Sequence, residues 1–147
     1  MSKDAKVTKD LMETLEDGRK GFTQAAEKLA ESDRADLAPK FRELAEQRAG
    51  FYAELEKMAA AYGDDLDEDG SVGAAVHRGW MSLKDALSGS DPDGVLDAAE
   101  QGEDHAVSEY QDALEQDISA DLKQTIQRQY TAIQTAHGEV KALRDAT

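Results

Sequence analysis

The stretch AAEQGEDHAVSEY, residues 98–110, concentrates side chains that could bind a metal ion. Within one helical run it carries Glu100, Glu103, Asp104, His105 and Glu109. Carboxylate oxygens and imidazole nitrogens together suit iron or manganese. The same residue types are also typical of a solvated helix surface. The elements that position these side chains therefore decide between the two interpretations.

Helical spacing separates these residues into two groups. Glu103 lies four residues after Ala99 and three before Ala106, so it points toward the interior with them. Glu100 lies at the edge of that face, and the other three point toward solvent. A carboxylate in the interior needs a partner, because an unpaired buried charge costs several kcal/mol. Glu103 is therefore the residue of this stretch that requires an explanation.

Composition restricts the class of protein. The chain has 147 residues, no cysteine, 17 Lys+Arg and 32 Asp+Glu, with a formal net charge of −15. This length suits one domain, and the charge argues against binding nucleic acid or an anionic membrane surface. Without cysteine there is no disulfide and no thiolate metal site. The N-terminus lacks the apolar segment of a signal peptide, and no apolar run reaches membrane-spanning length. We expect a soluble cytoplasmic protein.

Apolar residues recur at alternating spacings of three and four, which predicts amphipathic helices and no strands. After a disordered tail at about 1–6, we expect helices at about 7–30, 36–62, 72–88, 92–116 and 119–145. Asp36 and Ser119 are candidate N-caps, and Pro39 fits a first helical turn. Short loops pair the first two and the last two helices, and a long connection containing the short helix joins the pairs. This arrangement predicts an all-α, ferritin-like antiparallel four-helix bundle in a single domain.

Three polar residues fall on inward stripes near the middle of their helices, namely Arg48, Glu103 and His137. The last long helix is expected to bury Leu122, Ile126, Tyr130, Ile133, His137 and Val140. Gly18, on the stripe of the first helix, leaves space for a long side chain. We expect Arg48 and Glu103 to form a buried ion pair with His137 hydrogen-bonded nearby, a structural layer that fixes helix register.

A metal centre is the alternative interpretation of the same layer. Glu103 and His137 would then be ligands, helped by Glu100, Glu46 or Glu16, and iron or manganese would be the metal. Ferritin-like di-metal sites use a Glu from each of two helices and Glu-x-x-His from each of the other two. This chain lacks that pairing, since Ala49 follows Glu46 at the third position. Arg48 would also repel a dication, so we expect no cofactor.

The acidic segment DLDEDGSV resembles the first half of an EF-hand calcium loop. Asp65, Asp67, Asp69 and Gly70 match its pattern, but the twelfth position, where calcium needs a bidentate Glu, is Val76. Acidic residues before a helix are also favourable without an ion. We interpret this segment as a helix-preceding loop, with calcium binding as the alternative.

Several motifs together resemble a known family. ETLEDGRKGF (13–22), FRELAEQRAGFYAEL (41–55), GSVGAAVHRGWMSLKDALSG (70–89), GEDHAVSEYQDAL (102–114) and RQYTAIQTAHGEVKALRD (128–145) are similar to a family of bacterial proteins. That family is a domain of unknown function in the ferritin-like superfamily. The resemblance implies a four-helix bundle and a bacterial cytosolic origin, and it implies no activity.

From these observations we expect a non-catalytic helical-bundle protein, with a stress-associated role and homodimer formation as hypotheses. Its polar layer would be structural or a degenerate metal site. A di-iron or di-manganese carboxylate protein, handling iron or acting as an oxidoreductase, is the first alternative. A helical protein–protein interaction module, acting through exposed apolar residues around Val107 or Met81, is the second. The sequence identifies no protein partner.

Overall fold

The structure is a computed structural model that describes residues 3–60 and 92–146. These residues form four α-helices and one 3-10 helix: α1 Lys3–Ala30, η1 Ala35–Leu37, α2 Ala38–Ala59, α5 Pro92–Leu114 and α6 Ala120–Ala146. The described residues contain no strand, so the all-α prediction is confirmed for them. The predicted helix at 72–88, the candidate calcium loop and Met81 lie outside the described residues.

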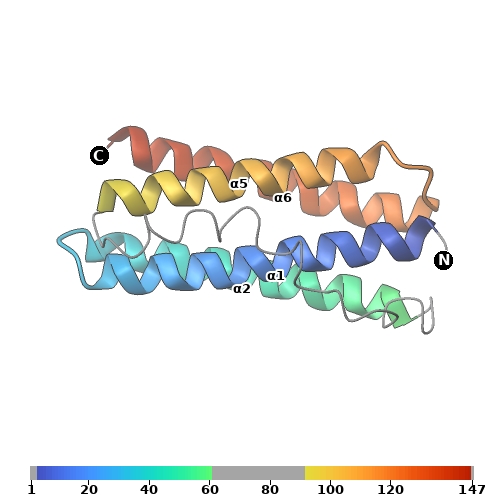
Figure 1. Ribbon diagram of the computed structural model, residues 1–147, viewed down its shortest axis with the longest axis horizontal. Coiled ribbons are helices and arrows are strands. Elements are labelled where there is room, and N and C mark those ends of the chain that lie inside the picture. The colour runs from blue at the N-terminus through green and yellow to red at the C-terminus, as the bar shows by residue number, and fades with distance from the viewer. Residues whose placement is uncertain (1–2, 61–91, 147) are drawn as a thin grey trace.

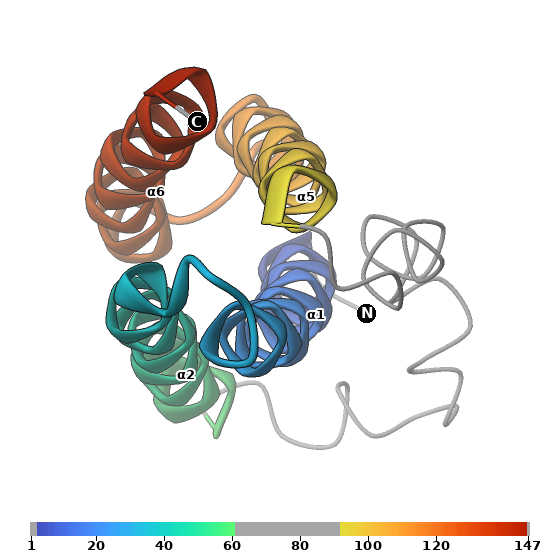
Figure 2. The ribbon, with the colours of Figure 1, turned by 90° about the vertical axis from the view of Figure 1, so that its left-hand side faces the viewer.

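The four long helices lie alongside one another as a bundle (Figure 1). Helix α1 packs against both α2 and α5, α5 also packs against α6, and α2 and α6 touch more sparsely. Each of these neighbouring pairs is antiparallel, whereas α2 and α5 run in the same direction. The view along the bundle shows α2 and α5 on opposite corners (Figure 2). A side chain that joins α2 to α5 must therefore cross the centre of the bundle.

The N-termini of α2 and α6 test the N-cap and first-turn residues that the sequence predicts. Ser119 caps α6, because its Oγ accepts a hydrogen bond from the backbone N–H of Leu122 at 3.4 Å. Pro39 lies in the first turn of α2, as predicted. Asp36 was predicted to cap α2, and that prediction is wrong. Asp36 lies within η1 and its carboxylate binds Arg34 at 3.2 Å, so Leu37 precedes α2 without any side-chain cap.

Helix α1 begins at Lys3, four residues before the expected start. The extra turn is anchored to the connection between α5 and α6, since the Asp4 carboxylate accepts a hydrogen bond from the backbone N–H of Ser119 at 3.0 Å. An acidic residue in a first helical turn is also stabilised by the helix dipole. The structure therefore places helix where the sequence analysis expected a disordered tail.

Buried apolar side chains form two clusters along the bundle. One cluster lies around Phe22, Phe41 and Leu96, and the other lies around Leu15, Leu55 and Ile126. On α1 the boundary falls between Leu15 and Phe22, and on α5 it falls between Ala99 and Ala106. Polar residues occupy that boundary.

No helix in the described ranges is long and apolar enough to cross a membrane.

Candidate functional site

Arg48 occupies the middle of the bundle. It lies four residues after Leu44 on the inward face of α2, and it is 1% exposed. Its Nη1 donates a hydrogen bond to Glu103 Oε1 at 2.6 Å, and its Nη2 donates to Glu103 Oε2 at 2.8 Å. Two parallel charge-assisted bonds of this kind are the strongest geometry for a guanidinium and a carboxylate. The ion pair joins α2 to α5 through the bundle centre.

Glu103 is the other half of the pair, and it is 0% exposed. It faces inward because Ala99 and Ala106, at helical spacing on either side of it, are also buried. Both of its carboxylate oxygens accept hydrogen bonds from Arg48. The pairing offsets the large cost of removing each charge from water. The structure thus brings together the two residues that the sequence analysis placed in one layer.

Gly18 on α1 makes the approach of Arg48 possible. A Cβ atom added at Gly18 would lie 3.5 Å from Arg48 Nη1 and 3.6 Å from Arg48 Cγ. Any side chain longer than alanine would therefore meet the arginine. The expected space beside Gly18 is confirmed, and the Arg48 side chain fills it.

Two further contacts hold the guanidinium. Its central carbon lies 5.1 Å from the centre of the Phe22 ring, and its Nε donates a hydrogen bond to Gln47 Oε1 at 3.1 Å. A cation over an aromatic face is attracted to the ring electrons. Arg48 is therefore held by groups on α1 and α2 in addition to Glu103 on α5.

His137 does not join this pair. Its Nε2 lies 2.5 Å from Asp104 Oδ1, at the edge between α5 and α6, and its side chain is 27% exposed. The expectation of His137 beside Glu103 in the layer is therefore corrected. The reason is that Ala136, one residue earlier, takes the inward position on α6 and is 1% exposed. His137 is rotated by one residue toward solvent.

The remaining predicted metal ligands, apart from the calcium loop, are either paired with arginines or exposed to solvent. Glu100 binds Arg144 at 2.6 Å, Glu16 binds Arg19 with two hydrogen bonds, and Glu46 is exposed on α2. Within the described parts of the chain, no group of three or more His, Asp or Glu side chains is placed to hold a metal ion. The three predicted calcium ligands Asp65, Asp67 and Asp69 lie outside those parts.

A second buried polar chain was missed by the sequence analysis. Tyr110 donates a hydrogen bond to Gln129 Oε1 at 2.6 Å, and Gln129 Nε2 donates to Glu54 Oε1 at 2.8 Å. Glu54 also binds Arg128, so the chain links α5, α6 and α2. Burial raises the pKa of the Tyr110 phenol, because the phenolate would lose its hydration.

A signal for this chain was present in the sequence. Gln129 lies three residues after Ile126 and four before Ile133, which places it on the inward face of α6. Buried polar residues also occur on α1, where Thr8, Thr14 and Asp17 are each at most 6% exposed. Asp17 directly precedes Gly18. The interior is thus more polar than the sequence analysis expected.

The architecture and the central ion pair define the class of protein, an all-α bundle of long helices with a paired guanidinium and carboxylate in its interior. The chain belongs to the family described as Domain of unknown function (DUF2383), whose profile matches residues 5–116. The match extends from α1 through the end of α5. A comparison with curated proteins found no match.

Proposed function

We propose that this protein is a non-catalytic, cytoplasmic helical-bundle protein that acts through its surface. In this proposal the Arg48–Glu103 pair has a structural role and sets the register of α2 against α5. The observation that carries the proposal is the pair of hydrogen bonds of 2.6 and 2.8 Å that engages both oxygens of Glu103. A carboxylate bound in this way is already neutralised.

The charge of Arg48 argues against a dication at the same place. A guanidinium stays protonated in proteins, and its repulsion of a nearby dication would be strong in a poorly hydrated interior. Glu103 could serve as a ligand only if Arg48 swung away, and Gly18 and Phe22 hold it in place. A purely structural pair also agrees with the apolar clusters on either side of it.

Ferritin-like ancestry is part of the proposal. Helix α2 ends at the opposite end of the bundle from the start of α5, so the two helices are parallel (Figure 1). Among the four long helices that the structure describes, a parallel second and third helix is the order found in ferritin-like bundles. In such a lineage the ion pair would replace a metal centre, and a bacterial stress-associated role is the corresponding biological hypothesis.

The specific alternative with support is a protein–protein interaction module. Several apolar side chains pack only partly against the second cluster and keep some exposure: Met12, Phe51, Tyr52, Met58, Val107 and Tyr130. Partly exposed aromatic residues and methionines are enriched where proteins associate. Homodimer formation through these residues is one form of this function, and sedimentation velocity over a range of concentrations measures it.

Metal analysis tests the structural role of the pair. The full chain is expressed with added iron and manganese, and the metal content is measured by mass spectrometry. We expect far less than one metal atom per chain, both in the unchanged protein and in an exposed control, Glu46→Ala. A content of about two atoms per chain, lost in Glu103→Ala but kept in the control, would instead establish a di-iron or di-manganese protein.

A further inference from the structure

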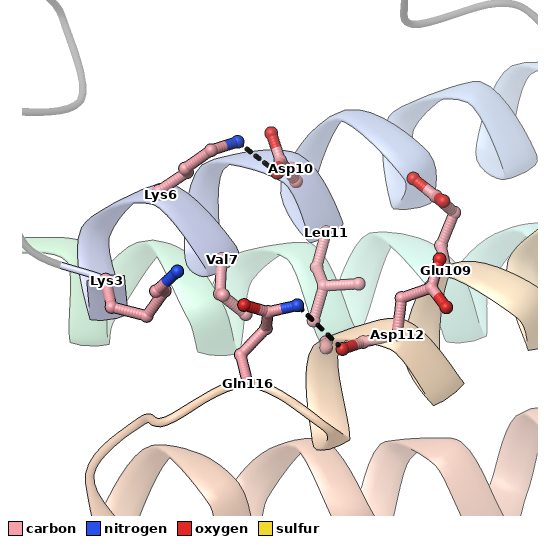
Figure 3. A pocket seen from close by; sticks show the side chains of 9 residues that line it. Lys3, Lys6, Val7, Asp10, Leu11, Glu109, Asp112 and Gln116 are labelled. Atoms are coloured by element: carbon pink, nitrogen blue, oxygen red, sulfur yellow. Dashed lines mark hydrogen bonds and ion pairs between the residues drawn. The ribbon is translucent and has the colours of Figure 1, made fainter.

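A pocket lies between the start of α1 and the end of α5 (Figure 3). Its volume is about 180 Å³, and its lining includes Val7, Leu11 and Ala113, which are at most 6% exposed. This apolar floor belongs to the second core cluster. The floor is therefore held by the packing of the bundle.

The two walls of the pocket carry opposite charges. Lys3, Lys6 and Asp10 lie on the α1 side, which leaves that wall with a net positive charge (Figure 3). Glu109 and Asp112 lie on the α5 side. Lys6 binds Asp10 at 3.2 Å on its own helix. Lys3, Glu109 and Asp112 form no ion pair with any other residue in the described ranges. One ammonium group and two carboxylates therefore line the pocket with their charges unpaired.

The charge distribution along the chain makes these lysines distinctive. Helix α5 carries seven acidic residues and no Lys or Arg, within a chain of net charge −15. The first turns of α1 place Lys3 and Lys6 directly across from the end of this acidic helix. The pocket is thus a place where strong potentials of both signs meet over a short distance.

The relative position of the walls is fixed by the backbone. The Asp4 carboxylate accepts a hydrogen bond from the backbone N–H of Ser119 at 3.0 Å, which joins the first turn of α1 to the connection after α5. Gln116 Nε2 donates to the backbone carbonyl of Asp112 at 3.4 Å on the α5 side. The pocket therefore exists before any ligand arrives.

We propose that this pocket binds a small aliphatic zwitterion. Its ammonium group would bind Glu109 and Asp112, its carboxylate would bind the unpaired Lys3, and its methylene groups would cover the apolar floor. The volume equals that of roughly six water molecules, which is below the range of drug-sized ligand sites. A simple amine would be repelled by the lysines and a simple carboxylate by the acids, so a ligand with both charges fits best.

The pocket is separate from the central ion pair, because no hydrogen bond or ion pair in the described parts of the chain joins its lining residues to Arg48 or Glu103. It also differs from a metal site. The described residues hold no cluster of three metal-binding side chains, and ammonium groups at the pocket would repel a cation.

Isothermal titration calorimetry with 4-aminobutanoate tests the proposal on the full chain at low salt. Butylamine and butanoate, each with one of the two charges, serve as matched ligands. We expect saturable binding of 4-aminobutanoate and at least about tenfold weaker binding of the other two compounds, since each lacks one set of charge-assisted hydrogen bonds. Equal binding of all three compounds, or no saturable heat, would overturn the proposal.

Variants assign the binding to this pocket. Lys3→Gln and Glu109→Gln are each expected to weaken the binding of 4-aminobutanoate by about tenfold, and Glu46→Gln on the exposed face of α2 is the control. Circular dichroism confirms that each variant is folded, which is expected for side chains at the surface. Unchanged affinity in both pocket variants would place any binding elsewhere and contradict the proposal.

Discussion

Replacing Arg48 by methionine and Glu103 by leucine, separately and together, probes the centre of the bundle. Arg48→Met leaves a carboxylate with no partner, and Glu103→Leu leaves a guanidinium with none. The double variant removes both charges and leaves apolar side chains between the two core clusters. Because Arg48 and Glu103 are each only 1% exposed at the side chain, water cannot replace the missing partner in the single variants.

The expected magnitudes follow from burial and pairing. Breaking a buried ion pair by removing one partner costs about 3–5 kcal/mol, whereas replacing both partners by well-packed apolar residues is often neutral or stabilising. At about 2–4 °C per kcal/mol for a protein near this size, each single variant should lower Tm by roughly 6–20 °C. We expect the double variant to lie within about 2 kcal/mol of the unchanged protein.

Urea unfolding followed by circular dichroism measures these free energies. Single variants within about 1 kcal/mol of the unchanged protein would refute a buried, tightly paired layer. So would a double variant that loses the sum of the two single losses.

Three other predictions concern individual helices. Gly18→Ala and the exposed Gly50→Ala should each stabilise the protein by up to about 1 kcal/mol through helix propensity. A Cβ at Gly18 would meet Arg48 at ordinary van der Waals distances of 3.5 Å or more, and a Cβ at Gly50 would meet nothing within 4 Å. Urea unfolding compares the two variants, and a loss of stability in Gly18→Ala would contradict this packing. Burial raises the pKa of Tyr110, so the stability that its protonated phenol contributes is lost as pH rises above the ordinary tyrosine pKa of 10.0. Spectrophotometric titration should therefore show one of the four tyrosines ionising only as the protein unfolds at high pH, and Tyr110→Phe should abolish this delayed step. His137→Gln should change the unfolding free energy by less than about 1 kcal/mol, because its pairing is at the surface, and a loss of several kcal/mol would return His137 to the interior layer.

Periodicity was sufficient to predict the central pair. Arg48 and Glu103 each lie at three- and four-residue spacing from apolar neighbours, which places both in the interior. Because their charges are opposite, pairing them avoids leaving either charge buried without a partner. The position of Gly18 could be interpreted in the same way, because a glycine on a buried stripe leaves space that a long side chain from another helix can fill. The all-α class followed from the same spacing.

Periodicity failed on α6 because two stripes fit its sequence. The expected stripe used Tyr130 and His137, whereas the buried one uses Gln129 and Ala136, each shifted by one residue. Both stripes consist only of spacings of three and four residues, and the bulkier side chains of Tyr130 and His137 suggested the wrong one. Gln129 became buried because Tyr110 and Glu54 supply its hydrogen bonds, which are contacts between helices far apart in the chain.

Local capping rules failed at Asp36 for a related reason. The residue type favoured an N-cap, but Arg34 lies two residues away and binds the carboxylate. This contact also lowers the pKa of Asp36, since the charged form is favoured beside the guanidinium. N-cap preference describes the residue at the cap position alone, so it does not predict that a neighbouring arginine will bind the carboxylate instead.

The structural role of the Arg48–Glu103 pair can be tested by X-ray diffraction from crystals grown with iron and manganese, with anomalous data collected at both metal absorption edges. We expect Arg48 to remain hydrogen-bonded to both oxygens of Glu103, with no anomalous peak beside that carboxylate. An anomalous peak bonded to Glu103, with the Arg48 guanidinium displaced from it, would show that Glu103 is a metal ligand.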